Sequence, residues 1–267
     1  MPINRQFSLA LEALAELKAE IVPDQPKPVP FDATQGRPAA PTLTEVLAEI
    51  GSLPREALFL GIASDGLPVL LNMSDPIPGP LLIVGDASAG KTALLKLIAR
   101  AAQQTHYSTD VQFGALTNYP EEWDDIPTNE HHVGVFPMHH NSARDFVLSL
   151  ASWAHANKSK QAVLLLIDDL EAIANLDSDA LQNFRWLLLR GPARRVWPIV
   201  TLNAERYGQV LPWIPTFRTR IFGRIQDGRV AEALGADQAS GVDRLEAGIQ
   251  FSLRENGGWL RFWSPGG

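Results

Sequence analysis

The sequence predicts an α/β domain with a mainly parallel central sheet, helices on both of its faces and flanking β-hairpins. Through the middle of the chain, short apolar runs alternate with segments of helical periodicity, which is the order that parallel sheets with right-handed crossovers produce. One run, residues 81–84, leads into a glycine-rich loop that opens a helix. Another, residues 163–167, is continuously apolar, as strands buried on both faces are, and stops at two aspartates.

The composition is that of an ordinary globular protein, and it narrows the possible chemistry. Apolar residues make up 45% and charged residues 20% of the 267 residues, so a core can form without covalent cross-links. The chain has no cysteine, which excludes disulfides, thiolate metal sites and cysteine nucleophiles. The sequence shows neither a signal-peptide pattern nor an apolar run long enough to span a membrane, so we expect a cytoplasmic protein without membrane insertion.

The charge of the chain is negative overall and changes sign toward the C-terminus. A net charge of −7 argues against a protein that coats nucleic acid by bulk attraction. Beyond residue 184, however, there are twelve arginines, no lysine and seven acidic residues. Arginine without lysine suits fixed contacts to phosphates or carboxylates, although solvated arginines and internal ion pairs give the same composition.

The first 41 residues are predicted to stand apart from the domain that follows. Apolar side chains recur at helical spacing in residues 1–21, which predicts an amphipathic helical arm. Residues 22–41 contain six prolines, which predicts an extended linker. We expect the arm to dock a partner or to support oligomerisation, and residues 42–267 to form the main domain.

The elements of the main domain follow from periodicity and turn residues. Thr42 or Thr44 can cap a short helix that ends before Gly51. Apolar runs at 58–63 and 67–73 flank a Ser-Asp-Gly turn, which predicts a β-hairpin. The other predicted elements are strands at 81–84, 111–116, 133–136, 163–167, 199–202 and 219–224, helices at 91–103, 143–156, 178–190 and 229–234, and a closing hairpin at 249–253 and 259–262.

The glycine-rich loop reads GDASAGKT and fits the phosphate-loop pattern G-x(4)-G-K-[ST] between a predicted strand and a predicted helix. Its glycines let successive N–H groups turn toward phosphates, and the helix N-terminus adds partial positive charge. Lys91 is predicted to contact the β- and γ-phosphates and Thr92 to bind Mg²⁺, so ATP and Mg²⁺ are the expected ligands. The residues expected to contact the nucleotide are Gly85, Asp86, Ala87, Ser88, Ala89, Gly90, Lys91, Thr92 and Ala93.

The two aspartates after the run 163–167 are candidates for metal binding and catalysis. Phosphate-loop enzymes hold Mg²⁺ with an aspartate at the end of a neighbouring strand, a role that Asp168 fits. Asp169 stands where hydrolytic members of this class usually carry the glutamate that polarises the attacking water. Its shorter side chain predicts slow turnover or a helper such as Glu171. Alternatively, the pair caps a helix that begins at Leu170.

Asn203 follows the predicted strand at 199–202. In ATPases of this topology a polar residue at that place contacts the γ-phosphate or the attacking water, so Asn203 is a candidate catalytic sensor. The alternative is a plain turn residue, because asparagine is common in turns.

Together, these segments resemble the FtsK/HerA superfamily of ring-forming motor ATPases, whose cores are RecA-like. The resemblance covers about residues 58–265. It rests on the hairpin at 58–69, the phosphate loop, the acidic strand end, the strand ending at Asn203 and the segments 217–221 and 234–248. Asp169 in place of glutamate and Asn203 in place of glutamine depart from the family pattern. A similar pair of aspartates occurs in the terminal ATPase domain of type VII secretion motors.

The resemblance implies a homo-oligomer, for example a hexameric ring, with nucleotide at subunit interfaces and DNA or a polypeptide in the central pore. It also implies an arginine that reaches the γ-phosphate bound by a neighbouring subunit. The candidates for this arginine finger are Arg194, Arg195, Arg218 and Arg220, of which Arg195 and Arg220 are the selected pair.

Two functions remain open at this stage. The first is an oligomeric ATPase that couples hydrolysis to the movement of DNA or protein, which Asn203 and the arginine-rich C-terminal third favour. The second is a nucleotide-dependent assembly or switch protein with little hydrolysis, which Asp169 and the compact size favour. A small-molecule kinase is disfavoured, because no arginine-rich lid segment follows the central strand.

Overall fold

The computed structural model describes residues 41–255 and 257–266, which belong to one compact unit of the chain, residues 40–267. The predicted arm, residues 1–21, and the predicted linker, apart from its last residue, lie outside the described residues. Both stay predictions, as does the boundary of the domain at residue 42.

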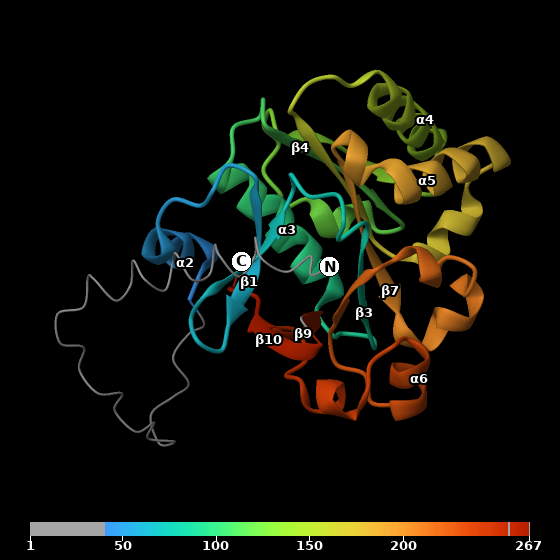
Figure 1. Ribbon diagram of the computed structural model, residues 1–267. Coiled ribbons are helices and arrows are strands. Elements are labelled where there is room, and N and C mark those ends of the chain that lie inside the picture. The colour runs from blue at the N-terminus through green and yellow to red at the C-terminus, as the bar shows by residue number, and fades with distance from the viewer. Residues whose placement is uncertain (1–40, 256, 267) are drawn as a thin grey trace, which may run out of the picture. The chain divides into compact units, whose positions relative to one another are not determined.

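Ten strands of the described residues form one sheet in the order β2-β1-β10-β9-β8-β3-β7-β6-β4-β5 (Figure 1). Six neighbouring strands are mutually parallel: β8 (Thr219–Phe222), β3 (Leu81–Gly85), β7 (Val196–Asn203), β6 (Ala162–Ile167), β4 (Val111–Thr117) and β5 (His132–Pro137). Four antiparallel strands continue the sheet beyond β8: β9 (Gln250–Glu255), β10 (Gly258–Trp263), β1 (Ala57–Ala63) and β2 (Pro68–Asn72). The predicted mainly parallel sheet with flanking hairpins is confirmed.

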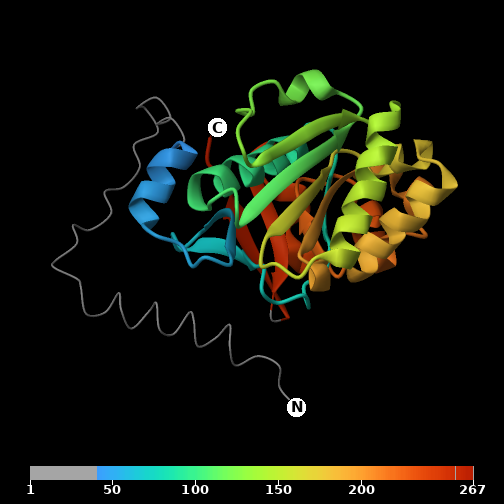
Figure 2. The same ribbon diagram turned by 90° about the horizontal axis from the view of Figure 1, so that it is seen from above.

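The helices cover both faces of the sheet, as predicted (Figure 2). On one face, α3 (Lys91–Thr105) and α2 (Leu43–Ile50) pack with Leu81 and Ile83 of β3. On the other face, α4 (Asn141–Ala156), α5 (Ser178–Arg190) and α6 (Gly228–Ala233) pack with Leu82 and Val84. Because successive residues of a strand point to opposite faces, the continuous apolar run of β3 fills both layers.

Local signals set where several helices begin. Thr42 caps α2 in a capping box with Glu45, and Gly51 follows its last residue. Asp177 caps α5 by accepting a hydrogen bond from the Ala180 backbone nitrogen. Short 3₁₀ helices make up many of the connections: η1 (Pro120–Trp123), η2 (Leu170–Asn175), η3 (Pro192–Arg194), η4 (Ala204–Val210), η5 (Ile214–Thr216), η6 (Gln238–Ser240) and η7 (Val242–Arg244). No helix within the described part of the chain is both long and apolar enough to cross a bilayer.

Strand β7 begins at Val196, three residues before its predicted start. Pro198 lies within it, paired with Leu165 of β6 in the middle of the sheet. Proline has no backbone donor and is usually confined to sheet edges, so the sequence favoured a start after it. Conversely, β8 ends at Phe222, before the predicted end at 224.

The two flanking hairpins pair with each other. Strand β10 lies between β9 and β1, with Ile62 opposite Trp263. The backbones of β1 and β10 lie close together here, and a Cβ on Gly61 would be only 2.5 Å from the Trp263 carbonyl oxygen. Beside it, Thr42 and Gly266 form a β-bridge. The sequence predicted both hairpins but did not indicate that one closes on the other.

Candidate nucleotide-binding site

The register of the parallel strands brings the predicted site residues to one edge of the sheet. Gly85 at the end of β3 lies opposite Asn203 at the end of β7. Ile167, the last residue of β6, pairs with Val200 of β7, so the aspartates that follow lie at the same edge. Because β7 lies between β3 and β6, the phosphate loop, Asn203 and the two aspartates occupy neighbouring positions.

The phosphate loop connects β3 to the first residue of α3, Lys91. Ser88 and Gly90 have left-handed backbone angles, with φ of 60° and 87°. Gly90 precedes α3, and within the described part of the chain no side chain caps this end of the helix. Its first N–H groups are therefore open to an anion, which is how helix N-termini bind phosphates.

Close backbone contacts hold the loop in shape. A Cβ on Gly85 would lie 2.7 Å from that of Ala89, and one on Gly90 would lie 2.4 Å from the Gly248 carbonyl oxygen. The chain after β8 is bound to the loop, because the Asp86 backbone nitrogen donates to the Arg224 carbonyl oxygen over 2.9 Å. Any side chain at the two loop glycines would displace these neighbours.

Lys91 folds back over the loop, with its ammonium donating to the Asp86 carbonyl oxygen over 2.8 Å. Burial lowers the pKa of Lys91, and the negative charges of Asp169, Asp168 and Glu171 oppose that effect. The ammonium thus lies on the loop, within the electrostatic influence of these carboxylates.

Thr92 and Asp168 form the centre of the site. The Thr92 hydroxyl lies 3.0 and 2.9 Å from the two carboxylate oxygens of Asp168. Asp168 is 4% exposed, and burial raises the pKa of its carboxyl to about 6. A hydroxyl and a carboxylate are the hard oxygen ligands that Mg²⁺ prefers, so these residues fit the metal that the sequence predicts.

Asp169 has an unusual backbone conformation for a residue with a side chain, with φ of 76°. Its N–H donates to the Thr201 hydroxyl over 2.7 Å. Asp169 occupies the N-cap position of η2, but its side chain makes no capping hydrogen bond there. The Asp168 carboxylate instead accepts from Thr92 and Thr201, so the alternative interpretation of the pair as a helix cap is not supported.

Asn203 lies beside the phosphate loop, and its side-chain oxygen accepts from the Glu205 backbone nitrogen over 3.2 Å. This contact is the turn role that the sequence left open. Its place opposite Gly85 also suits a residue that contacts the γ-phosphate, and the sensor role stays a prediction.

Known proteins resemble this chain in structure. No protein-family model and no curated protein sequence matches it. EccC of Thermomonospora curvata (ATPases 2 and 3), in complex with a signal sequence peptide, matches with a TM-score of 0.66 at 17% identity, over 90% of this chain and 45% of that one. The cytoplasmic domain of EssC matches with a TM-score of 0.63 at 14% identity, over 96% of this chain and 51% of that one. The pCW3 conjugation coupling protein TcpA, in its monomer form with ATPγS, matches with a TM-score of 0.58 at 11% identity, over 90% of this chain and 70% of that one.

The fold is that of a RecA-like ATPase. The predicted structural resemblance to FtsK/HerA-type ATPases is confirmed over most of the chain. At these identities the likeness concerns the fold alone, and the chain spans about half the length of the EccC and EssC chains that it matches.

The selected finger candidates, Arg195 and Arg220, are held within their own RecA-like domain. Arg195 precedes β7, at the end of that strand opposite to Asn203, and donates to the Met73 carbonyl oxygen and the Glu56 carboxylate. Arg220 donates to the carbonyl oxygens of Phe217, Leu234 and Ile214. Neither side chain is brought to its own phosphate loop, so any finger role would act on a neighbouring subunit and stays a prediction. Arg194 and Arg218 are exposed.

Three residues at the site were missed by the sequence analysis. Thr201 is fully buried and donates to Asp168 Oδ1 over 2.9 Å. The sequence marks it only as a polar residue within the apolar run 199–202. Arg206, in η4, forms an ion pair with Glu171 over 3.2 Å. Arg224 follows β8 beside the loop, and its buried Nε has no hydrogen-bond partner among the described residues. No motif marks either arginine.

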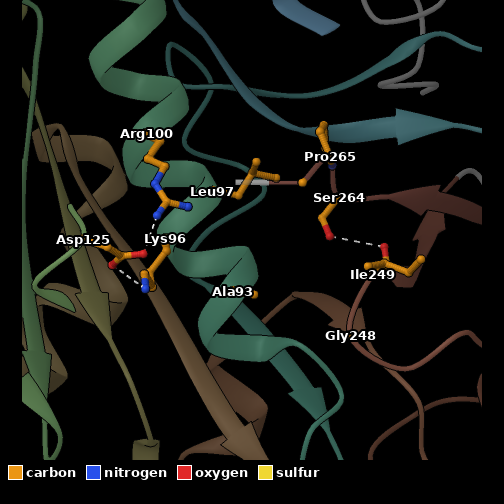
Figure 3. Close-up of a pocket in the computed structure, with 10 residues that line it drawn as sticks. Ala93, Lys96, Leu97, Arg100, Asp125, Gly248, Ile249, Ser264 and Pro265 are labelled. Atoms are coloured by element: carbon orange, nitrogen blue, oxygen red, sulfur yellow. Dashed lines mark hydrogen bonds and ion pairs between the residues drawn. The ribbon is translucent and has the colours of Figure 1, made fainter. Parts of the chain in front are cut away.

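A cavity of about 300 Å³ lies beside the first turns of α3 (Figure 3). Ala93 and Leu97 face it from the helix, and Ile249, Ser264 and Pro265 close it from the C-terminal part of the domain. Lys96, Arg100 and Asp125 also line the cavity, and both cations pair with the Asp125 carboxylate. The cavity thus begins one residue beyond Thr92, next to the phosphate loop.

Proposed function

We propose that this chain is an oligomeric ATPase that binds ATP with Mg²⁺, hydrolyses it slowly and couples the nucleotide state to the movement of DNA or a polypeptide. The observation that carries the proposal is the contact of the Thr92 hydroxyl with both carboxylate oxygens of Asp168, 3.0 and 2.9 Å away, beside an uncapped helix N-terminus. A phosphate-binding helix end next to hard oxygen ligands suits a nucleotide with its metal.

The phosphates are expected to lie on the loop from Gly85 to Thr92, with the Lys91 ammonium leaving its contact to Asp86 for the β- and γ-phosphates. Thr92 and Asp168 would hold Mg²⁺, which neutralises charge on the phosphates when bound. The divalent metal would offset the negative charge that the phosphates add beside Asp168 and Asp169.

The cavity beside α3 is expected to take the ribose and base. It starts at Ala93, at the end of the loop where a nucleotide would continue beyond its phosphates, and it is large enough for a small ligand at about 300 Å³. Its apolar side chains, Leu97, Ile249 and Pro265, suit the flat face of a base, and the ion-paired group of Lys96, Arg100 and Asp125 supplies its polar wall.

Coupling to a polymer is supported by the proteins that share the fold. The EccC structure contains a signal sequence peptide, and TcpA is described as a conjugation coupling protein. One of these proteins binds a peptide and the other is a conjugation coupling protein, and we keep both a polypeptide and DNA as candidate substrates in the proposal. We place the chain in the cytoplasm, like the matched domain of EssC, and expect it to form a homo-oligomer.

A nucleotide-dependent assembly or switch protein is the second candidate. The short Asp169 side chain, on a backbone already held by Thr201, favours little hydrolysis. In that case ATP would order subunits without regular turnover.

Two measurements on the full chain test the proposal. Isothermal titration should show that Lys91→Ala weakens the affinity for ATP with Mg²⁺ at least about tenfold, since a charge-assisted contact to a phosphate is lost. Unchanged affinity would contradict nucleotide binding at the loop. Phosphate release is then measured with and without DNA. Stimulated release supports the motor, whereas tight ATP binding without release favours the switch.

A further inference from the structure

We propose that Glu171, rather than Asp169, is the carboxylate that orients and deprotonates the attacking water. This assignment rests on the hydrolytic part of the proposed function and names the residue that would carry it.

The position of Glu171 fits this role. It belongs to η2, which begins directly after the two aspartates at the end of β6, and it faces η4, which begins directly after Asn203 at the end of β7. Strand β7 is the neighbour of β3, and β6 is the next strand, with Asp168 after its end in contact with Thr92. A carboxylate between η2 and η4 therefore lies over the edge where the γ-phosphate is expected.

The Glu171 carboxylate has one fixed oxygen and one free oxygen. Oε1 accepts from Arg206 over 3.2 Å, and the Glu171 side chain is only 9% exposed. Oε2 is buried and has no hydrogen-bond partner among the described residues. Buried polar atoms normally have partners, so an unpartnered acceptor at this edge suits a water that enters with the nucleotide.

The charge around Lys91 supports the same placement. The carboxylate of Glu171 acts on the Lys91 ammonium together with those of Asp169 and Asp168. The effect of Glu171 is smaller than those of Asp169 and Asp168, so it agrees with a position near Lys91, while the choice of Glu171 over Asp169 rests on the contacts of the two side chains.

Asp169 is less suited to the role. Its backbone has φ of 76° and is fixed by the hydrogen bond to Thr201, so its short side chain has little freedom to reach further. Glu171 is one methylene longer and is held by Arg206. The length of the side chain matters, because a small displacement of the carboxylate from the attacking water lowers the hydrolysis rate by a large factor.

In the proposed step, the water oxygen forms a bond to the γ-phosphorus while the bond from that phosphorus to the β–γ bridging oxygen breaks. ADP leaves with the electron pair of the broken bond. The proton of the water passes to Glu171 Oε2 and is then released to solvent, so Glu171 ends in its starting form.

The test compares three variants of equal charge change in the full chain. Glu171→Gln keeps the shape of the side chain, Asp169→Asn is the direct competitor, and Glu205→Gln removes an exposed carboxylate from the same edge as a control. We measure phosphate release at saturating ATP with Mg²⁺, and ATP affinity by isothermal titration. Glu171→Gln is expected to lower kcat at least about 100-fold, in the range for a lost general base, with Kd changed less than about threefold. Asp169→Asn should lower kcat less than about tenfold, and Glu205→Gln should leave it unchanged.

Three results would overturn the assignment while leaving the proposed function in place. These are a Glu171→Gln protein within tenfold of the wild-type rate, a loss of ATP binding in that variant as large as its loss of rate, or an equal loss of rate in Asp169→Asn. A wild-type chain that binds ATP tightly and never releases phosphate would instead overturn the hydrolytic function itself, and this assignment with it.

Discussion

The Thr201 hydroxyl donates to Oδ1 of Asp168 over 2.9 Å. The same hydroxyl oxygen accepts from the backbone N–H of Asp169 over 2.7 Å. One buried side chain on β7 thus fixes the carboxylate expected to hold the metal and the backbone of the residue that follows it. The two contacts hold the end of β6 against its neighbouring strand at the point where the chain turns.

Replacing Thr201 by valine keeps the shape of the side chain and removes both contacts. We expect Thr201→Val to lower the free energy of unfolding by about 1 to 3 kcal/mol, because a buried carboxylate and a buried N–H lose a partner. Urea unfolding measures this. Thr44→Val, at an exposed threonine of α2, is the control and should change stability by less than about 0.5 kcal/mol. Equal unfolding midpoints for the two variants would contradict the role of Thr201.

In the absence of metal, the contribution of Asp168 to the free energy of unfolding should fall as the pH rises through 6. Burial raises the pKa of Asp168 from 3.8 to about 6, so the folded state binds this proton more tightly than the unfolded state. The stabilisation is present at low pH and is lost as pH rises through the folded pKa. Between pH 5 and 7, in a chelator, wild type should lose about 1 kcal/mol of unfolding free energy relative to Asp168→Asn. A difference between the two proteins that does not vary with pH would contradict this prediction.

Arg195 and Arg194 are neighbours with different expected effects. The Arg195 side chain is 19% exposed and donates to Glu56 and to two carbonyl oxygens, those of Met73 and Lys160. Arg195→Ala should lower the free energy of unfolding by about 2 to 4 kcal/mol, because charged hydrogen bonds are lost and acceptors are left unpaired. Arg194→Ala, at an exposed side chain, should change it by less than about 0.5 kcal/mol. Thermal or urea unfolding of the two variants measures this difference. Equal stabilities would show that the contacts of Arg195 contribute little.

A site shared between subunits can be tested by mixing inactive variants. If Arg194 or Arg218 reaches the γ-phosphate of a neighbour, Arg194→Ala or Arg218→Ala should lower kcat with little change in ATP affinity. Mixing such a variant with Lys91→Ala should restore part of the activity, at interfaces that join an intact loop to an intact arginine. Head-to-tail contacts of this kind form rings or helices, so light scattering should show more than a dimer. A fully active monomer, with a rate per chain independent of concentration, would exclude a shared site.

Local sequence signals were enough to predict most elements of the described domain. The phosphate loop was predictable because its glycines, lysine and threonine are consecutive, and β6 because its apolar run is continuous. The capping box of Thr42 and Glu45 lies within one turn of α2. In each case the residues that decide the structure are neighbours in the chain.

Contacts between distant residues were not predictable in this way. Thr201 meets Asp168 and Arg206 meets Glu171 only because β6 and β7 are adjacent, and the sequence does not state strand order. The arginines illustrate the same limit. Arg194 and Arg195 are adjacent in sequence, yet one is exposed and the other donates to the carbonyl oxygens of Met73, which follows β2, and Lys160, which precedes β6.

The pairing of β1 with β10 has a consequence for how the protein is made. The β1–β2 hairpin is synthesised long before β10, the strand that joins it to the sheet. Until then the hairpin presents an open edge, the kind of surface that nascent chains pair wrongly or that chaperones cover. The same strand order means that a chain ending before residue 258 would contain the six parallel strands and β9 but not β10, so the β1–β2 hairpin would pack on α3 without a hydrogen-bonded neighbour in the sheet.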